Sequence, residues 1–110
     1  MDISSETKDN ITVVRLEGNL DTNTSTDAQD YLNNAIDGGA SKVVVSFDKV
    51  DFVSSAGLRV LLATAKKLGG GGGALRVCGL NETVAEIFEI SGFSTIINVF
   101  PSETEALAGF

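Results

Sequence analysis

Two adjacent serines, Ser54 and Ser55, are the residues best placed for a chemical reaction in this sequence, because they lie where a loop passes into an amphipathic helix. The first turn of a helix carries unpaired N–H groups and about half a positive charge, so it receives a phosphate well. A serine hydroxyl there could accept a phosphoryl group, gaining a charge of about −1.5 to −2, while the helix stays intact. An unmodified N-cap has the same appearance. Spacing alone therefore indicates the cap and leaves phosphorylation open.

Three aspartates would make the surface around the new phosphate more anionic if they lie beside the serines. Asp48 and Asp51 precede the serines in the same stretch, and Asp21 follows an earlier predicted strand. Functional groups of parallel sheets gather beyond the carboxyl ends of the strands, so we expect these carboxylates to share one edge of the sheet. In the alternative interpretation each is an ordinary solvated loop residue.

Composition excludes several kinds of chemistry. The 110 residues include no histidine and a single cysteine, Cys78. Catalysis by a Ser-His-Asp triad, histidine-ligated metal sites and an internal disulfide are therefore ruled out. The formal net charge is −7 with no Lys/Arg cluster, which disfavours nucleic acid and anionic membranes as partners. We predict no cofactor, no metal and, for Cys78, a buried apolar position.

Length and hydropathy indicate one small domain. No apolar run approaches the roughly 18 residues that span a bilayer. The first residues lack the basic and apolar regions of a signal peptide, so we expect a cytoplasmic protein. A chain of this size forms a single domain, here residues 1–110.

Strand and helix patterns alternate along the chain and predict an α/β fold. Strands are expected at 3–8, 11–17, 42–47, 75–78 and 95–99, and apolar positions at helical spacing predict four helices, beginning after residues 22–27, at Ser54 or Ser55, after Asn81 and after Ser102. Helical crossovers make the sheet mostly parallel, and an opening hairpin makes it mixed. The glycines at 69–73 lack the Gly-Lys-Ser/Thr of a phosphate-binding loop, so we interpret them as a flexible connection.

The segment from Val50 to Leu62 resembles the signature of the STAS domain, and specifically that of bacterial anti-sigma factor antagonists. The resemblance extends over nearly the whole chain. It includes the family's G-x-L-D at Glu17–Asp21, its central strand at Lys42–Asp48, Leu75–Gly79, and the Ile-Phe-x-x-x-Gly-Phe ending of Val84–Phe93.

That resemblance implies a regulatory protein without a catalytic site of its own. In the family, the unphosphorylated antagonist binds an anti-sigma factor, which is also a serine kinase of the ATPase type, and thereby frees the sigma factor. The kinase then phosphorylates the antagonist, the complex dissociates, and a separate serine phosphatase resets the cycle. We expect a monomer, or at most a weak dimer. Many relatives control targets other than a sigma factor, so the target is open.

The family pattern Asp-Ser-Ser/Thr/Ala-Gly-Leu, aligned on Gly57 and Leu58, implies that Ser55 is the phosphate acceptor. Ser54 is the second choice, at a position where the family often has aspartate. Gly57 is expected to permit close approach of a partner or of the neighbouring loop. Residues expected to contact the partner are Asp21, Asp48, Asp51, Ser54, Ala56, Gly57 and Arg59.

Two other classes of function stay open at this stage. Asp48 follows a β-branched strand as the acceptor of a phospho-aspartate receiver would, although the paired acidic residues of a magnesium site are missing. A STAS module could also hold a nucleotide or another small anion near Asp21 and Ser55. A serine hydrolase is disfavoured, because there is no histidine and no Gly-x-Ser-x-Gly elbow.

Overall fold

The chain begins with a hairpin whose tight turn is formed by Asp9 and Asn10. Both residues adopt positive φ angles, 50° and 68°, which Asp and Asn tolerate better than most side chains. The turn joins β1 (Asp2–Lys8) to β2 (Ile11–Glu17) in antiparallel pairing. The predicted opening hairpin is therefore confirmed.

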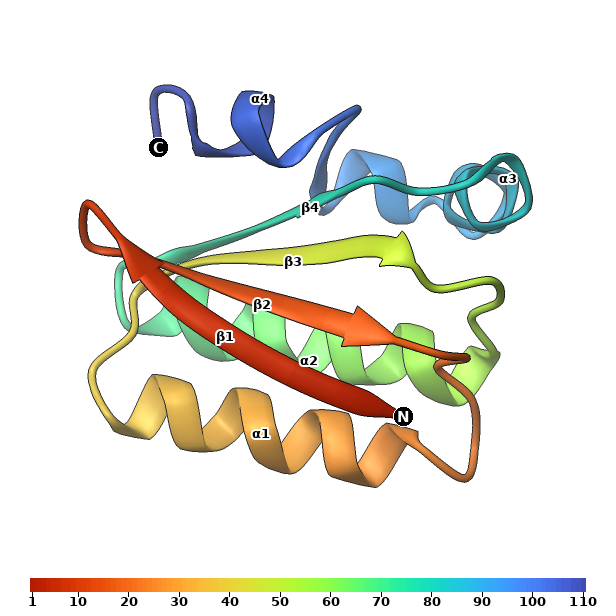
Figure 1. Ribbon diagram of the computed structural model, residues 1–110, viewed down its shortest axis with the longest axis horizontal. Coiled ribbons are helices and arrows are strands. Elements are labelled where there is room, and N and C mark those ends of the chain that lie inside the picture. The colour runs from red at the N-terminus through yellow and green to blue at the C-terminus, as the bar shows by residue number, and fades with distance from the viewer.

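The computed structural model describes all 110 residues, and the remaining strands extend the sheet in parallel (Figure 1). The sheet order is β1-β2-β3-β4-β5, and β2 to β5 run parallel. These later elements are α1 (Ser25–Asp37), β3 (Lys42–Lys49), α2 (Ser55–Gly70), β4 (Ala74–Cys78), α3 (Glu82–Ile90), a 3-10 turn (Phe93–Thr95), β5 (Asn98–Phe100) and α4 (Glu103–Leu107). The predicted mixed α/β sheet with four helices is confirmed.

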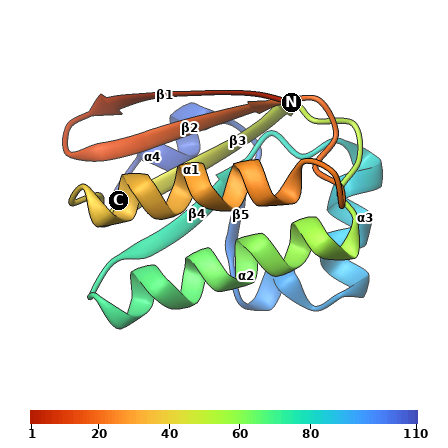
Figure 2. The same ribbon diagram turned by 90° about the horizontal axis from the view of Figure 1, so that it is seen from below.

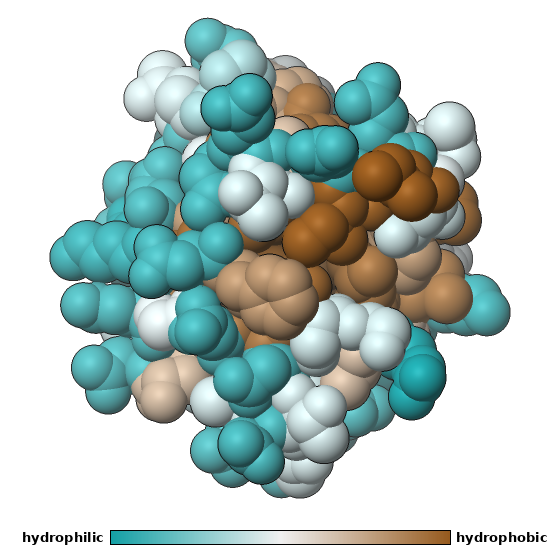
Figure 3. Space-filling model, turned by 90° about the vertical axis from the view of Figure 1, so that its right-hand side faces the viewer, coloured by the Kyte–Doolittle hydropathy of each residue, from teal (hydrophilic) through white to brown (hydrophobic).

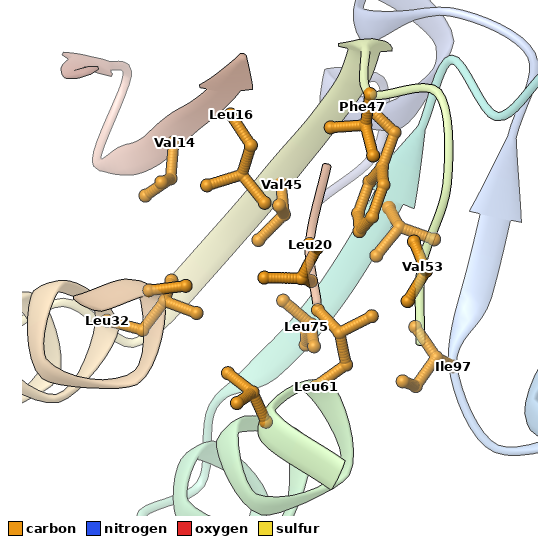
Figure 4. Close-up of a cluster of buried hydrophobic side chains, with 14 of the residues drawn as sticks. Val14, Leu16, Leu20, Leu32, Val45, Phe47, Val53, Leu61, Leu75 and Ile97 are labelled. Carbon is orange, nitrogen blue, oxygen red and sulfur yellow. The ribbon is translucent and has the colours of Figure 1, made fainter. Parts of the chain in front are cut away.

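The main core lies between the sheet and helices α1 and α2, which run side by side beneath it (Figure 2). Alternate residues of β3 point to opposite faces, as the pleat of a strand requires. Val43, Val45 and Phe47 belong to the main core, whereas Val44 belongs to a smaller cluster on the other face. Figure 4 shows side chains from β2, β3, β4, α1 and α2 converging in the main core.

Helix α4 covers part of the opposite face and is held there by charge as well as by apolar packing. Ala106 is buried in the smaller cluster with Val44 and Cys78. The Arg15 guanidinium donates to both carboxylate oxygens of Glu103, at 3.2 Å from Nε and 2.7 Å from Nη2. Lys8 Nζ donates to the same carboxylate at 3.1 Å. These hydrogen bonds lower the pKa of Glu103.

Two expectations for the later half of the chain are wrong in part. The glycines are not all a flexible connection, because α2 continues through Gly69, ends at Gly70 and is capped by Gly71. Gly73 is also constrained, since a side chain there would collide with the backbone of Ser41. The last strand is shorter than 95–99: Thr95 ends the 3-10 turn, and pairing with β4 starts only at Asn98.

None of the helices combines the length and the apolar character that crossing a membrane demands.

Replacing Glu103 with Gln tests the charged attachment of α4. The folded-state pKa of Glu103 is lowered, so its contribution to stability is present above its ordinary value of 4.5 and is lost as the pH falls through the folded value. We predict that Glu103→Gln lowers the free energy of unfolding by less than about 1 kcal/mol at neutral pH, because the groups are partly exposed. Urea denaturation should show this difference shrinking below pH 4.5. Glu105→Gln is the control, since Glu105 forms no ion pair, and an equal effect in both variants would contradict the assignment.

Candidate functional site

The loops that follow β2 and β3 are held together by the backbone of Leu20. Leu20 N–H donates to the Phe52 carbonyl at 3.0 Å, and Ser54 N–H donates to the Leu20 carbonyl at 2.9 Å. Leu20 and Val53 form an isolated parallel bridge, and both side chains are buried in the main core (Figure 4). The segment carrying the serines and the segment carrying Asp21 therefore lie side by side at the carboxyl edge of the sheet.

The two serines do different things at the start of α2. Ser54 is the N-cap, and its hydroxyl accepts a hydrogen bond from Gly57 N–H at 3.3 Å. Ser55 is the first helical residue, its side chain is exposed, and its hydroxyl forms no hydrogen bond within the protein. Capping thus accounts for Ser54 alone and leaves the Ser55 hydroxyl free to react.

The electrostatics of this helix end favour added negative charge at Ser55. The first turn of α2 contains no acidic residue. The N–H groups of Ser55 and Ala56 have no backbone partner, whereas those of Gly57 and Leu58 are bonded to Ser54. A phosphate on Ser55 would lie close to these free donors and to the positive end of the helix dipole.

Gly57 is required by the close packing of α2 against the neighbouring loop. A Cβ at this position would stand 2.8 Å from both Cγ and the carbonyl oxygen of Leu20, and 3.0 Å from Val53 Cγ1. Backbone contacts of that kind cannot be relieved by rotating a side chain. Of the two approaches expected for Gly57, the structure shows that of the neighbouring loop.

Asp21 and Asp51 lie at the same end of the molecule as the serines. The Asp21 carboxylate is engaged in its own turn, where Oδ1 accepts from the N–H groups of Asn23 at 2.9 Å and Thr24 at 3.2 Å. Asp51 is exposed in the loop before α2. Asp21 therefore stabilises the turn before α1, and its Oδ2 can accept a hydrogen bond from solvent or from a partner.

Asp48 does not join this group, which corrects the expectation of one shared carboxylate patch. Its side chain lies on the opposite face of the sheet, where it accepts from the Ser46 hydroxyl at 3.3 Å and packs against Gly79. The reason is the alternation of β3, which gives Asp48 the same direction as Val44 and Ser46. A cleft of about 340 Å³ opens on that face beside Arg15, Ser46 and Asp48, and neither Asp21 nor Ser55 lines it.

Ala56 and Arg59 lie on the surface beside Ser55. Ala56 is half-buried in the first turn of α2. Arg59 is exposed one turn further along and forms no ion pair within the protein. Both residues are therefore available at the surface that carries Ser55.

Exposed apolar residues at this end are a feature that sequence patterns did not single out. Phe52 is 44% exposed and Ile90 is 79% exposed. Figure 3 shows hydrophobic surface gathered on this side of the molecule, which bears α3 and the loop before α2. Ile90 falls outside the buried stripe of α3, which runs through Val84, Ile87 and Phe88, and that mismatch is the signal that could have identified it.

Buried thiol chemistry plays no part in this site. Cys78 lies under α4, and burial raises the pKa of its thiol to about 11. The thiol is therefore protonated and unreactive at neutral pH. The expectation of a small buried apolar residue at this position is confirmed.

Comparison with known proteins identifies the relatives of this chain. A family model described as the STAS domain matches residues 2–106. BtrV of Bordetella bronchiseptica, to which the role of an anti-sigma factor antagonist is provisionally assigned, is 36% identical over 100% of this chain and 95% of its own length. The anti-sigma F factor antagonist of Paenibacillus polymyxa is 31% identical over 97% of this chain and 92% of its own. The structure of the Bacillus cell fate determinant SpoIIAA in its phosphorylated form superposes with a TM-score of 0.74 at 23% identity, covering 96% of both chains.

Substituting two glycines of the same helix tests the packing of α2 on Leu20. We predict that Gly57→Ala lowers the free energy of unfolding by about 1–3 kcal/mol, because the new methyl group meets Leu20 and Val53. Gly69→Ala is the matched control: a Cβ there meets nothing within 4 Å, so the better helix propensity of alanine should raise stability by up to about 1 kcal/mol. Urea denaturation measures both, and a Gly57→Ala protein as stable as Gly69→Ala would refute the packing constraint.

Proposed function

The chain belongs to the STAS domain family, and from this premise we propose that it is an anti-sigma factor antagonist whose binding is switched by phosphorylation of Ser55. The observation that carries the proposal is the exposed, unbonded Ser55 hydroxyl at the first residue of α2. The names of the two curated relatives support the regulatory role. The phosphorylated form known for SpoIIAA supports the chemical switch.

In its unphosphorylated state the protein binds an anti-sigma factor through the end of the molecule that carries Ser55. Phe52 and Ile90 supply exposed apolar contact area. Helix α3 adds exposed carboxylates at Glu82, Glu86 and Glu89 and has no basic residue. The complementary surface of the partner is therefore apolar at its centre and basic at its rim.

The predicted partner contacts divide according to their place on this surface. Those on or beside it are Asp21, Asp51, Ser54, Ala56 and Arg59. Gly57 is buried and acts by holding α2 against the neighbouring loop. Asp48 faces away, so the proposed interface does not include it.

The switch is a phosphoryl transfer in which this protein is the substrate. The anti-sigma factor acts as a serine kinase with bound ATP. Ser55 Oγ attacks the γ-phosphorus, a new O–P bond forms, and the bond from the γ-phosphorus to the β,γ-bridging oxygen breaks. ADP leaves, and the hydroxyl proton passes to a base on the kinase. A serine phosphatase later restores the hydroxyl by hydrolysis, releasing inorganic phosphate.

The phosphate destabilises the complex with the partner and leaves the helix stable. The free N–H groups at Ser55 and Ala56 and the helix dipole stabilise the new charge in the isolated protein. In the complex the same charge of about −1.5 to −2 would be buried in a surface that fits a neutral hydroxyl. Burying a charge without a partner costs several kcal/mol, so the complex dissociates.

The proposed role also defines the domain organisation, the lack of catalysis and the cellular location of the protein. Residues 1–110 act as one STAS domain and as a ligand and substrate, without catalysis of their own. A protein that releases sigma factors in this way works in the cytoplasm with its kinase and phosphatase.

Serine variants test the acceptor assignment. We predict that the wild-type protein, incubated with purified ATPase-type serine kinases of its host and ATP, gains the mass of one acid-stable phosphate. Ser55→Ala should gain none, whereas Ser54→Ala should still be phosphorylated, because Ser54 serves the cap and its loss costs only about 1 kcal/mol of stability. Intact mass spectrometry measures each. A phosphate retained by Ser55→Ala and lost by Ser54→Ala would move the site, and an acid-labile phosphate lost by Asp48→Asn would support a receiver.

The charge mechanism is tested by the affinity of a phosphate mimic. We predict that Ser55→Asp weakens binding to the anti-sigma factor by tenfold or more, about 1.4 kcal/mol, since a carboxylate brings one uncompensated charge into the interface. Ser55→Ala should bind like the wild-type protein, because it stays neutral. Isothermal titration calorimetry measures both affinities, and equal binding by Ser55→Asp and Ser55→Ala would count against the mechanism.

The apolar part of the docking surface is tested at Phe52. We predict that Phe52→Ser weakens binding to the anti-sigma factor by about tenfold or more, as loss of a buried aromatic contact does in other interfaces. The free energy of unfolding should fall by only about 1–2 kcal/mol, because the residue is 44% exposed in the free protein. Calorimetric titration and urea denaturation measure the two quantities, and unchanged affinity would remove Phe52 from the interface.

A further inference from the structure

One amide side chain, that of Asn81, connects α3 to the loop that carries the acceptor serine. Its Oδ1 accepts from Val84 N–H at 2.8 Å and caps α3. Its Nδ2 donates to two successive carbonyls of the loop, those of Val50 at 3.3 Å and Asp51 at 3.1 Å. The sequence indicates the cap, since Asn is a favoured N-cap residue. The second contact exists only in the folded protein.

The loop is thereby fixed from two sides. On one side the backbone of Leu20 bonds to Phe52 and Ser54. On the other side Asn81 binds the two residues immediately before Phe52. The loop before α2 makes no other side-chain hydrogen bond to α3 or its N-cap. Asn81 is therefore the polar connection that sets the loop against α3.

We propose that Asn81 is a positioning residue for phosphoryl transfer to Ser55: it fixes the acceptor loop relative to α3, so that a kinase docked on α3 meets the hydroxyl at the right place. This inference rests on the proposed function. In the transfer, Ser55 Oγ forms its bond to the γ-phosphorus of ATP as ADP departs, and the hydroxyl proton goes to the kinase. Such displacements depend steeply on alignment, and a shift of about 1 Å can cost a hundredfold in rate.

The chemistry of the amide provides a selective variant. Asn81→Asp keeps an oxygen that caps Val84 N–H, and Asp is as good an N-cap as Asn. A carboxylate cannot donate, so the bonds to Val50 and Asp51 are lost and its second oxygen faces their two carbonyl oxygens instead. The helix should therefore persist while the loop moves.

The test compares the rate of transfer with the affinity of docking. We expect Asn81→Asp to lower the single-turnover rate of Ser55 phosphorylation at saturating kinase and ATP by tenfold to a hundredfold. The dissociation constant of the complex should change by less than about threefold, because the outer face of α3 is unchanged. Thr83→Asp is the matched control: it adds the same charge on exposed α3 surface without touching the loop, so at saturating kinase it should transfer at the wild-type rate even where its affinity for the kinase changes.

Each outcome decides between explanations. A wild-type rate in Asn81→Asp overturns the inference, and so does an equal loss of rate in Thr83→Asp, which would make charge the cause. If Asn81→Asp proves unstable to urea, Asn81→Ser replaces it, because serine caps the helix but is too short to reach the carbonyls; its rate then confirms or refutes the role of the donor. A wild-type protein that takes no phosphate would instead refute the proposed function itself.

Discussion

The close contact between Leu20 and the first turn of α2 is the constraint on which this end of the molecule depends. Leu20 pairs with the segment from Phe52 to Ser54. Because Gly57 has no side chain, the backbone and side chain of Leu20 can pack directly against it. A parallel sheet places the ends of neighbouring strands at one edge, but it does not fix the loops beyond them. Here backbone hydrogen bonds extend the order of the sheet into the loops, so the start of α2 is fixed against the segment after β2.

The fixed placement of the helix start is what the proposed switch at one residue requires. Ser54 takes the capping role and satisfies the helix backbone, which leaves the Ser55 hydroxyl exposed and unbonded. A phosphate at that position adds charge where the helix dipole accepts it, so the fold need not change. In the proposed function, the added charge changes the affinity of the partner for the surface formed with Phe52 and α3.

The two faces of the sheet have separate tasks. The face covered by α1 and α2 contains the main core and positions the start of α2, where Ser55 lies. The other face carries α4, held by the contact between Arg15 and Glu103, and leaves a polar cleft beside Asp48. Asp48 is near the serines in sequence but not in space, because its side chain points to this other face of the sheet.

Local patterns in the sequence determined the hairpin at Asp9 and Asn10, the alternation of strands and helices, a cap at Ser54 or Ser55 and the cap at Asn81, because turns, periodicity and capping depend on residues a few positions apart. The candidate acceptor followed from the same local pattern together with a family resemblance. Tertiary structure alone decided which face Asp48 occupies, why Gly57 has no room for a side chain, and that Asn81 reaches across to a distant loop. These outcomes depend on contacts between segments that lie far apart along the chain, and only the packed sheet brings those segments together.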